Sequence, residues 1–428
     1  MSSAQALLER QMMNTKPPAL AHLKVLDLSR VLAGPWCTQM LADLGADVVK
    51  VERPGVGDDT RHWGPPFLKD AQGKDTQHAA YFTCTNRNKR SITIDMAMPE
   101  GQALIKQLAA QSDILVENFK VGGLAHYGLD YDSIKAINPK LIYCSVTGFG
   151  QDGPYAERAG YDLMIQAMSG MMSITGQPPD QPGGDPMRVG VALTDLFTGV
   201  YACSAILAAL EVRHRTGLGQ HIDMALLDVG MAILANQAGG YLNTGHVPLR
   251  QGNTHPSLTP YQDFPTRDGA MLLAIGNDGQ FARFCAAAGR PEWSKDARFA
   301  TTAARVQHRA VLIPLMQEVT RTQTTAEWIT LLEDKAVPCG PINTIGEAFA
   351  DAQVQSRGLW VNQPLTQAAK DQTAIDTIAS VASPLRLMQT PPVLNRAPPA
   401  LGEHTQEVLA GLGLDPRQIA DLRQAGVV

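Results

Sequence analysis

Short apolar segments alternate with helix-like segments in the first part of the chain, and this alternation limits the possible folds more than any other feature. Residues 23–28 and 47–52 are short apolar runs of the kind that form buried strands. Between them, residues 36–44 follow a helical rhythm that ends at Gly45. A strand, a helix and a strand in this order form a β-α-β unit, with parallel strands and a right-handed crossover. The sequence therefore predicts an α/β fold built on a parallel sheet.

The alternation continues along the chain, so the predicted sheet is large. We expect further strands at 90–95, 113–117, 141–147 and 221–225. After residue 225 the character of the sequence changes, and a hairpin is expected around Asp268 and Gly269. A chain of 428 residues exceeds what one core usually holds, so we expect two domains or one large α/β body with an insertion.

The end of the first strand is the usual ligand position in this topology, but here it lacks the glycines of a dinucleotide site. Only Gly34 stands where the G-x-G-x-x-G pattern would let a pyrophosphate approach the backbone. We therefore do not expect a nicotinamide or flavin cofactor. Four basic residues near the predicted strand ends suit phosphate groups, unless they are solvated surface charges: Arg53, Arg87, Lys89 and Arg90.

Composition argues against several other classes of protein. The net charge of −5 and the lack of a basic stripe argue against nucleic-acid binding. Six scattered cysteines without a CxxC pair are typical of reduced thiols in a cytoplasmic protein, with neither a disulfide framework nor a metal site. Residues 1–18 have no basic segment followed by an apolar one, so we expect a flexible tail and no secretory leader. The longest apolar run, 189–210, is interrupted by polar residues and is not expected to span a membrane.

That apolar run, VGVALTDLFTGVYACSAILAAL, contains a single charged residue, Asp195. An ionised carboxylate in apolar surroundings is unfavourable unless it is hydrogen-bonded, paired or used in chemistry. Asp195 could cap a helix over 196–210, because aspartate is a preferred N-cap residue. The alternative is a functional carboxylate. The two interpretations are compatible, since a helix N-terminus is expected to lower the pKa of the carboxyl group and keep it ionised.

Several blocks of the sequence, in order, resemble the class III CoA-transferases, the CaiB/BaiF or formyl-CoA-transferase group. They cover nearly the whole chain from about residue 23. The blocks read LDLSRVLAGPWCTQMLADLGADVVKVERPGVGDDTR, NRNKRSITID, VENF, GFGQDGPYAERAGYD, VALTDLFTG, HRTGLGQHIDMALLD, GNTHPSLTPYQDF, VPCGPI and LGEHT. Within the family, the sequence looks most similar to the succinyl-CoA:dicarboxylate branch, the glutarate type.

The resemblance implies that Asp195, in VALTDLFTG, is the catalytic nucleophile. Its carboxylate would attack the thioester of an acyl-CoA donor, expected to be succinyl-CoA, and form a mixed anhydride. The released CoA thiolate would then form an aspartyl-CoA thioester, from which a free acid, expected to be dicarboxylic, takes the CoA. A carboxylate needs no helper base for this chemistry. The apolar neighbours Leu193, Leu196 and Phe197 would keep water from the anhydride.

The resemblance also implies, by position, which residues bind the substrates. The expected CoA contacts are Arg30, Val31, Leu32, Ala33, Arg53, Ile94, Asp95, Met96, Ala97, Asn118, Phe119, His126, Ala159, Gly160, Tyr161 and Asp162. Some family members carry an arginine at the position of His126, so a phosphate contact there is open. Gly252, Asn253 and His255 are expected to line the acceptor pocket, with Arg188 holding a distal carboxylate. The loop around Gly252 lacks the glycine-rich sequence of formyl-CoA transferase, which argues against formate and oxalate as the main pair.

CoA is a substrate in this scheme, and neither a tightly bound cofactor nor a metal is expected. Family members are homodimers whose chains thread through each other like links. The resemblance implies a Rossmann-like large domain built from 19–225 and 341–428, and a small α+β domain from 226–340.

Three other functions remain open. The related α-methylacyl-CoA racemases move an α-proton between a histidine and an aspartate, and Asp162 matches the segment that carries their aspartate. Tyr161 stands in place of the neighbouring histidine. The other two alternatives are a hydrolase or lyase of acyl-CoA, and an inactive CoA-binding scaffold in which Asp195 is only a helix cap.

Overall fold

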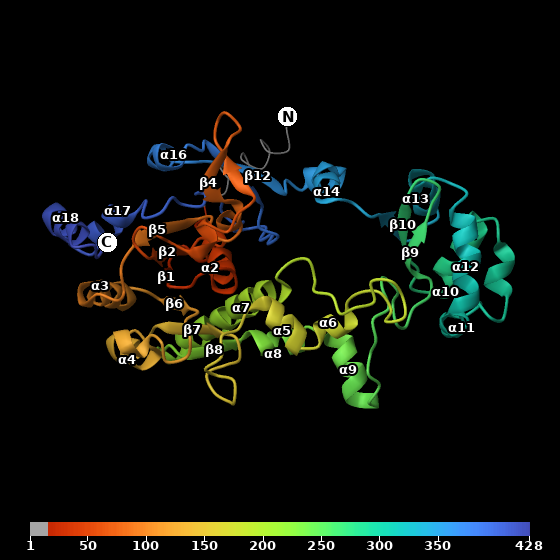
Figure 1. Cartoon of the computed structure of the whole chain (residues 1–428), viewed down its shortest axis with the longest axis horizontal. Helices are drawn as coiled ribbons and strands as arrows, with labels where there is room; N and C mark the ends of the chain where they lie inside the picture. The colour runs from red at the N-terminus through yellow and green to blue at the C-terminus, as the bar shows by residue number, and fades with distance from the viewer. Residues whose placement is uncertain (1–15) are drawn as a thin grey trace. The chain divides into compact units, whose positions relative to one another are not determined.

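The computed structural model describes residues 16–428, and a six-stranded sheet forms the centre of the first of two compact units. The strand order is β5-β2-β1-β6-β7-β8, and every neighbouring pair is parallel (Figure 1). The strands are β1 (Lys24–Asp27), β2 (Asp47–Glu52), β5 (Lys89–Thr93), β6 (Ile114–Glu117), β7 (Ile142–Thr147) and β8 (His221–Ala225). The predicted α/β fold with a parallel sheet is confirmed. Of the predicted tail, residues 1–15 lie outside the described residues.

Helices cover both faces of this sheet, because successive strand residues point to opposite sides. In β1, Val25 lies in the core with α2 and α7, whereas Leu26 lies in the core with α3 and α17. The helices of the first face are α2 (Ala33–Asp43), α5 (Asp162–Met168), α7 (Leu193–Thr216) and α8 (Leu226–Ala232). Those of the second face are α3 (Pro99–Ala110), α4 (Tyr131–Ile137), α17 (Thr405–Gly411) and α18 (Pro416–Gln424). The first unit is therefore a three-layer α/β/α sandwich, in which the C-terminal helices pack on N-terminal strands.

Two antiparallel hairpins and several short helices complete the first unit. The hairpins are β3 (Phe67–Lys69) with β4 (Asp75–Ala79), and β12 (Trp360–Pro364) with β13 (Thr377–Val381). The short helices are α15 (Ala352–Ser356) and α16 (Gln367–Thr373), and α9 (Ala235–Thr244) continues across the boundary of the unit.

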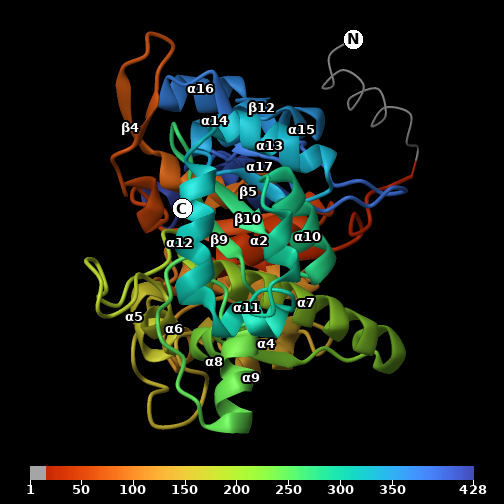
Figure 2. The same cartoon turned by 90° about the vertical axis from the view of Figure 1, so that its right-hand side faces the viewer.

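The second unit is built around a three-stranded antiparallel sheet, β11-β10-β9. Its strands are β9 (Tyr261–Pro265), β10 (Ala270–Ala274) and β11 (Cys339–Pro341), and its helices are α6 (Met171–Ile174), α10 (Asp278–Ala287), α11 (Thr302–Gln307), α12 (Arg309–Thr320), α13 (Thr325–Asp334) and α14 (Ile345–Ala350). Helix α12 lies along β9 (Figure 2). Met271 and Leu273 of β10 face the helices, whereas Leu272 between them is exposed. The hairpin predicted around Asp268 and Gly269 is confirmed by the pairing of β9 with β10.

The chain enters and leaves the second unit twice. The first unit extends through Gly170 and contains Val189–Ala238 and Asp351–Val428. The second contains Met171–Arg188 and Gly239–Ala350. The expected domain boundaries were residues 225 and 340, and the expected small domain did not include the segment Met171–Arg188.

Helix α7 has the length and composition to cross a membrane, the one such helix among residues 16–428. In the structure it packs on α2 and on the sheet, where Ala202, Cys203 and Ile206 are fully buried in the core. This is the environment of a core helix of an α/β unit. Its first turn carries Asp195.

Candidate active site

A cavity of about 230 Å³ opens where the direction of the strand order reverses. Strands β2 and β5 follow β1 to one side, while β6, β7 and β8 extend to the other, so the switch point lies between β1 and β6. Ligands bind in open α/β sheets at the carboxyl ends of the strands on either side of such a point. Of the residues expected from sequence, Arg30, Val31, Leu32, Ala33, Asn118, Phe119, Ala159, Gly160, Tyr161 and Asp195 line this cavity.

Several lining residues carried no sequence prediction. They are Asp59, Trp63, Lys120, Val121, Val146, Thr147, Gly148, Ala156, Arg158 and Leu226. Five of them, Lys120, Val121, Gly148, Ala156 and Arg158, lie in the loops after β6 and β7, so the signal that could have found these five is their position after a strand end.

Other expected contacts do not line the cavity. Arg53 and His126 are exposed at other places of the first unit, and Ile94 is buried in its core. Asp95, which precedes Met96 and Ala97, accepts a hydrogen bond from the Ala97 amide, 2.9 Å away. The expected acceptor residues Arg188, Gly252, Asn253 and His255 belong to the second unit.

The loop after β1 is held in an uncommon backbone conformation. Val31 has φ of 70°, which is rare for a β-branched residue and typical of functional sites. On one side, the Asn118 amide both accepts from the Arg30 N–H at 2.9 Å and donates to the Arg30 carbonyl at 2.8 Å. On the other side, the Val31 N–H donates to the Asp58 carboxylate at 3.2 Å. Asn118, expected to contact CoA, therefore also positions the loop that lines the cavity.

A network of buried ion pairs stabilises the loop after β1. Asp58 pairs with Lys50 at 2.9 Å, and Lys50 also donates to the Ser29 carbonyl at 2.8 Å. Asp27 pairs with Lys89 at 3.0 Å, and none of the four charged side chains is exposed. Burial and the neighbouring Lys50 lower the pKa of Lys89 to about 8, although Asp27 opposes the shift. Because each charge has its partner, the cost of burying them is offset.

The interpretation of three basic residues as phosphate ligands or solvated charges was wrong. Lys89 is fully buried against Asp27, Arg87 forms a two-pronged pair with Asp43, and Arg90 pairs with Asp47 and Glu407. These partners lie 43 to 317 positions away along the chain, so no local pattern could reveal them. Of the four basic residues, only Arg53 remains exposed at a strand end.

Asp195 lies inside the first turn of α7 and does not cap it. The helix begins at Leu193, its N-cap is Ala192, and no side chain caps it from that position. The cap comes instead from Asp162, whose Oδ1 accepts from the Thr194 N–H at 2.9 Å and from the Thr194 hydroxyl at 2.6 Å. Buried Gln166 donates to the other Asp162 oxygen at 2.7 Å and accepts from the Val189 N–H at 2.9 Å. The interpretation of Asp195 as a helix cap is therefore wrong.

The carboxyl group of Asp195 is not held as an ion by its surroundings. Burial, and then the charge of Asp162, raise its pKa from 3.8 to about 7, so the expectation of a lowered pKa was also wrong. In residues 16–428 no hydrogen bond or ion pair engages the carboxylate, which leaves it available for reaction. Leu193 and Leu196 are partly buried beside it, whereas Phe197 is 41% exposed.

Two glycines let backbone segments approach closely around Asp195. A Cβ on Gly199 would lie 2.7 Å from the Ala33 carbonyl oxygen, so α7 contacts the start of α2 without a side chain between them. A Cβ on Gly160 would lie 2.2 Å from the Gly148 Cα, so the segment before α5 lies on the loop after β7. Both contacts fix the walls of the cavity relative to Asp195.

A second polar group lies on the other side of residues 119–121. Glu117 is buried, and burial raises its pKa to about 7. Its carboxylate accepts from the Phe119 N–H at 2.8 Å. Ser145 lies beside it and shares a hydrogen bond of 2.9 Å with His221, whose ring stacks on Tyr131. Glu117 thus positions Phe119, which lines the candidate site.

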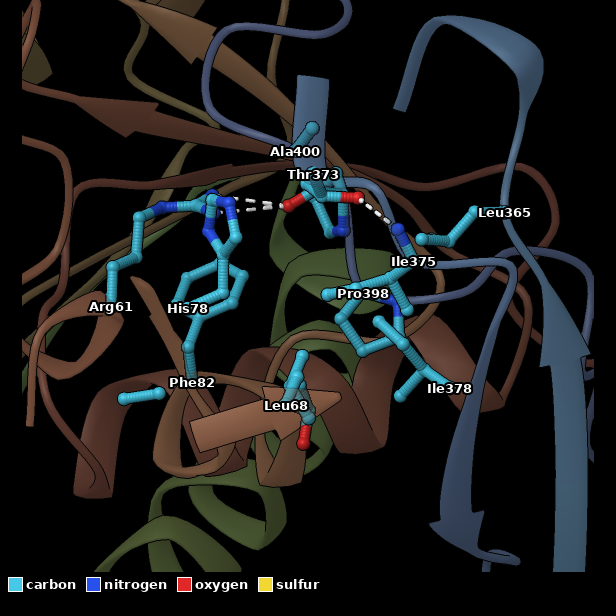
Figure 3. A pocket seen from close by; sticks show the side chains of 13 residues that line it. Arg61, Leu68, His78, Phe82, Leu365, Thr373, Ile375, Ile378, Pro398 and Ala400 are labelled. Atoms are coloured by element: carbon cyan, nitrogen blue, oxygen red, sulfur yellow. Dashed lines mark hydrogen bonds between the residues drawn. The ribbon is translucent and has the colours of Figure 1, made fainter. Parts of the chain in front are cut away.

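A small cavity behind Arg61 is too narrow for a substrate. Its volume is about 30 Å³, against about 230 Å³ for the cavity at the switch point, and its walls come from the β3–β4 hairpin and the C-terminal segment (Figure 3). Arg61 stacks on Phe82 and donates to the Pro399 carbonyl at 3.2 Å. It also pairs with Glu52 at 2.7 Å, so the cavity belongs to a structural contact that joins distant parts of the first unit.

Comparisons with known proteins agree with the geometry. The sequence profile of CoA-transferase family III matches residues 20–405. A succinate–glutarate CoA-transferase of Agrobacterium fabrum is 53% identical over 401 residues, which cover 94% of this chain and 97% of that protein. The human succinyl-CoA:glutarate CoA-transferase is 42% identical over 421 residues, 98% of this chain and 92% of that protein. The crystal structure of a CaiB/BaiF family protein from Brucella suis has a TM-score of 0.81 and 49% identity, covering 93% of this chain and all of that one.

Proposed function

This chain belongs to CoA-transferase family III, and we propose that it moves CoA from succinyl-CoA to a dicarboxylic acid such as glutarate. The names of the two similar glutarate CoA-transferases support this choice of substrates. The observation that carries the proposal is the unengaged carboxyl group of Asp195 at the wall of the switch-point cavity.

In this proposal the Asp195 carboxylate is the nucleophile. One of its oxygens bonds to the thioester carbonyl carbon of the donor, the C–S bond breaks, and the CoA thiolate leaves. The thiolate then attacks the aspartyl carbonyl of the anhydride, so the donor acid leaves and an aspartyl-CoA thioester remains. The acceptor carboxylate attacks that thioester, and the same steps in reverse release the new acyl-CoA and regenerate Asp195.

The walls of the cavity supply the binding groups for CoA. The loop that contains Arg30 and Val31, together with Asn118 and Phe119, offers backbone groups, a guanidinium group and a ring in one place. Arg53, Ile94–Ala97 and His126 stay predictions as CoA contacts, and Gly252, Asn253 and His255 stay predictions for the acceptor pocket. CoA acts as a substrate.

Proton transfer of the racemase type is the weaker alternative. Both oxygens of Asp162 accept hydrogen bonds, from Thr194 and from Gln166, that hold the start of α7. A carboxylate with these structural contacts is poorly placed to exchange a proton with a substrate carbon. We therefore assign Asp162 a positioning role in place of a CoA contact or a proton transfer.

The functional molecule in this proposal is a homodimer, with the interlocked chains of the family as its expected form. Helix α7 supports it with an exposed apolar face that includes Phe197, Val200, Tyr201 and Leu207, between 38% and 45% exposed in the single chain. Apolar faces of this kind are typical of contacts between protein chains. A second copy over this face would also cover Phe197 and shield the anhydride from water. A cytoplasmic location accords with the six free thiols.

Mass spectrometry of the protein after incubation with succinyl-CoA, without acceptor, tests the proposal. Hydroxylamine added afterwards is expected to convert the aspartyl thioester into a hydroxamate on the peptide that contains Asp195. The Asp195→Asn variant, which has nearly the same shape, should give no adduct. The opposite result would be an unmodified wild-type peptide together with exchange between the α-protons of a branched acyl-CoA and deuterated water. It would contradict the proposed transferase and favour a racemase.

A further inference from the structure

Arg158 and Lys120 are the two basic residues of the cavity wall that pair with no carboxylate within residues 16–428. Arg30 of the opposite loop pairs with Asp59 at 3.4 Å. The guanidinium of Arg158 instead lies over two aromatic rings, 4.5 Å from the centre of Tyr155 and 5.3 Å from that of Phe149. The two rings meet edge to face at 5.5 Å, so together they form one platform.

Such a platform prepares a guanidinium for binding an anion. Aromatic rings attract the flat faces of the group and leave its N–H edges free. The free edge of a guanidinium matches a carboxylate in a two-pronged hydrogen bond. Because the rings already restrict the side chain, less conformational entropy is lost when the anion binds.

The chain that carries Arg158 leads directly to the nucleophile. Gly160 fixes its path by packing on Gly148, and Asp162 then binds Thr194, the residue before Asp195. Arg158 forms no ion pair with Asp195, and its charge is not among the causes that shift the pKa of that carboxyl group. Both residues line the same cavity of about 230 Å³, so one bound molecule can contact both.

We propose that Arg158 binds the distal carboxylate of the dicarboxylic acyl group whose other carboxyl carbon reacts at Asp195. This proposal rests on the proposed function. Because the donor and the acceptor are both dicarboxylic acids and react in reverse order at one nucleophile, the same arginine serves both. Arg158 would thus take the role that the sequence suggested for Arg188, which lies in the second unit.

The test compares matched substrates that differ only in the distal carboxylate. Succinyl-CoA with glutarate is compared with butyryl-CoA and pentanoate, for the full-length wild type and for Arg158→Met, which keeps an apolar stem. We expect the preference for glutarate over pentanoate, as a ratio of kcat/KM, to fall about 10- to 100-fold in the variant, as for the loss of a hydrogen-bonded charge pair. Arg158→Lys should restore part of the preference, since it keeps the charge but not the two-pronged geometry.

Other results would overturn the proposal. If Arg158 bound a phosphate of CoA, Arg158→Met would weaken the binding of free CoA and slow both acceptors equally. A selective loss in Arg188→Met, with none in Arg158→Met, would return the role to Arg188.

Arg215→Met, at an exposed end of α7, is the control and should change neither ratio. If Arg158→Met does not fold, the same preference for glutarate over pentanoate is measured on Arg158→Gln. An absent Asp195 adduct in the wild type would refute the proposed function itself, independently of Arg158.

Discussion

At the scale of single residues, the raised pKa of Asp195 sets the pH range of the proposed reaction. Burial and the charge of Asp162 raise it to about 7, and only the ionised form is a nucleophile. We expect kcat/KM for succinyl-CoA to fall about tenfold per pH unit below pH 7 and to level off above it. Steady-state kinetics between pH 5 and 9 on the wild type provide the measurement. A profile that is flat down to pH 5 would contradict a raised pKa.

Asp162→Asn provides the comparison for this profile. The substitution removes the like charge and keeps an oxygen that can accept from the Thr194 N–H. Because burial is the larger cause of the shift, the midpoint should move to lower pH without reaching the ordinary aspartate value of 3.8.

The same residue makes the stability of the protein depend on pH. The folded state holds the proton of Asp195 up to about pH 7, whereas the unfolded chain releases it near pH 3.8. The free energy of unfolding is therefore expected to fall as the pH rises from about 3.8 to about 7, and the whole of this loss is present above pH 7. Asp195→Asn should raise the free energy of unfolding by at most about 4 kcal/mol at pH 8, and by less at pH 5. The midpoint of thermal unfolding should rise with it. Thermal unfolding at both pH values measures the difference, and an equal or lower midpoint at pH 8 would refute it.

At the scale of elements, the contact between α2 and α7 places Asp195, the proposed nucleophile. A Cβ on Gly199 would lie 2.7 Å from the Ala33 carbonyl oxygen and 2.9 Å from Trp36 Cδ1. Gly199→Ala should therefore push the two helices apart, cost about 1–3 kcal/mol of stability, and slow adduct formation at Asp195 one turn away. Hydroxylamine trapping and thermal unfolding report the two effects.

Gly411→Ala is the matched control, because no atom lies within 4 Å of a Cβ built on this glycine at the end of α17. It should leave both activity and stability near those of the wild type. If Gly199→Ala behaves in the same way, α7 does not depend on the close approach to α2.

The elements also show which parts of the structure a sequence can predict. Strands β2 and β8 have the predicted bounds because a short apolar run between turns is a local signal. The start of α7 at Leu193 was missed, since its cap is Asp162, 32 positions earlier in the chain. Lys89 was missed for the same reason: its partner Asp27 lies 62 positions away. Local patterns carry no record of such distant contacts.

At the scale of the whole molecule, the family resemblance predicted more of the candidate site than any pattern in the residues. The apolar run around Asp195 raised a question that chemistry alone left open between a cap and a nucleophile. The family blocks singled out the carboxylate that the structure places unengaged in a cavity, together with the loops after β1 and β6. They gave no reason to single out Arg158, whose platform depends on how Phe149 and Tyr155 fold back on it.

The proposed threaded dimer makes a prediction about the exchange of chains. Chains that pass through each other cannot separate unless at least one unit opens, so dissociation would require partial unfolding. Preparations with and without heavy isotopes, mixed under native conditions, should keep their separate masses of about twice 46.0 kDa for days. After unfolding and refolding together, a third species of intermediate mass is expected. Native mass spectrometry distinguishes the species. Mixed dimers within minutes of native mixing, or a mass of a single chain, would show that the chains are not interlocked.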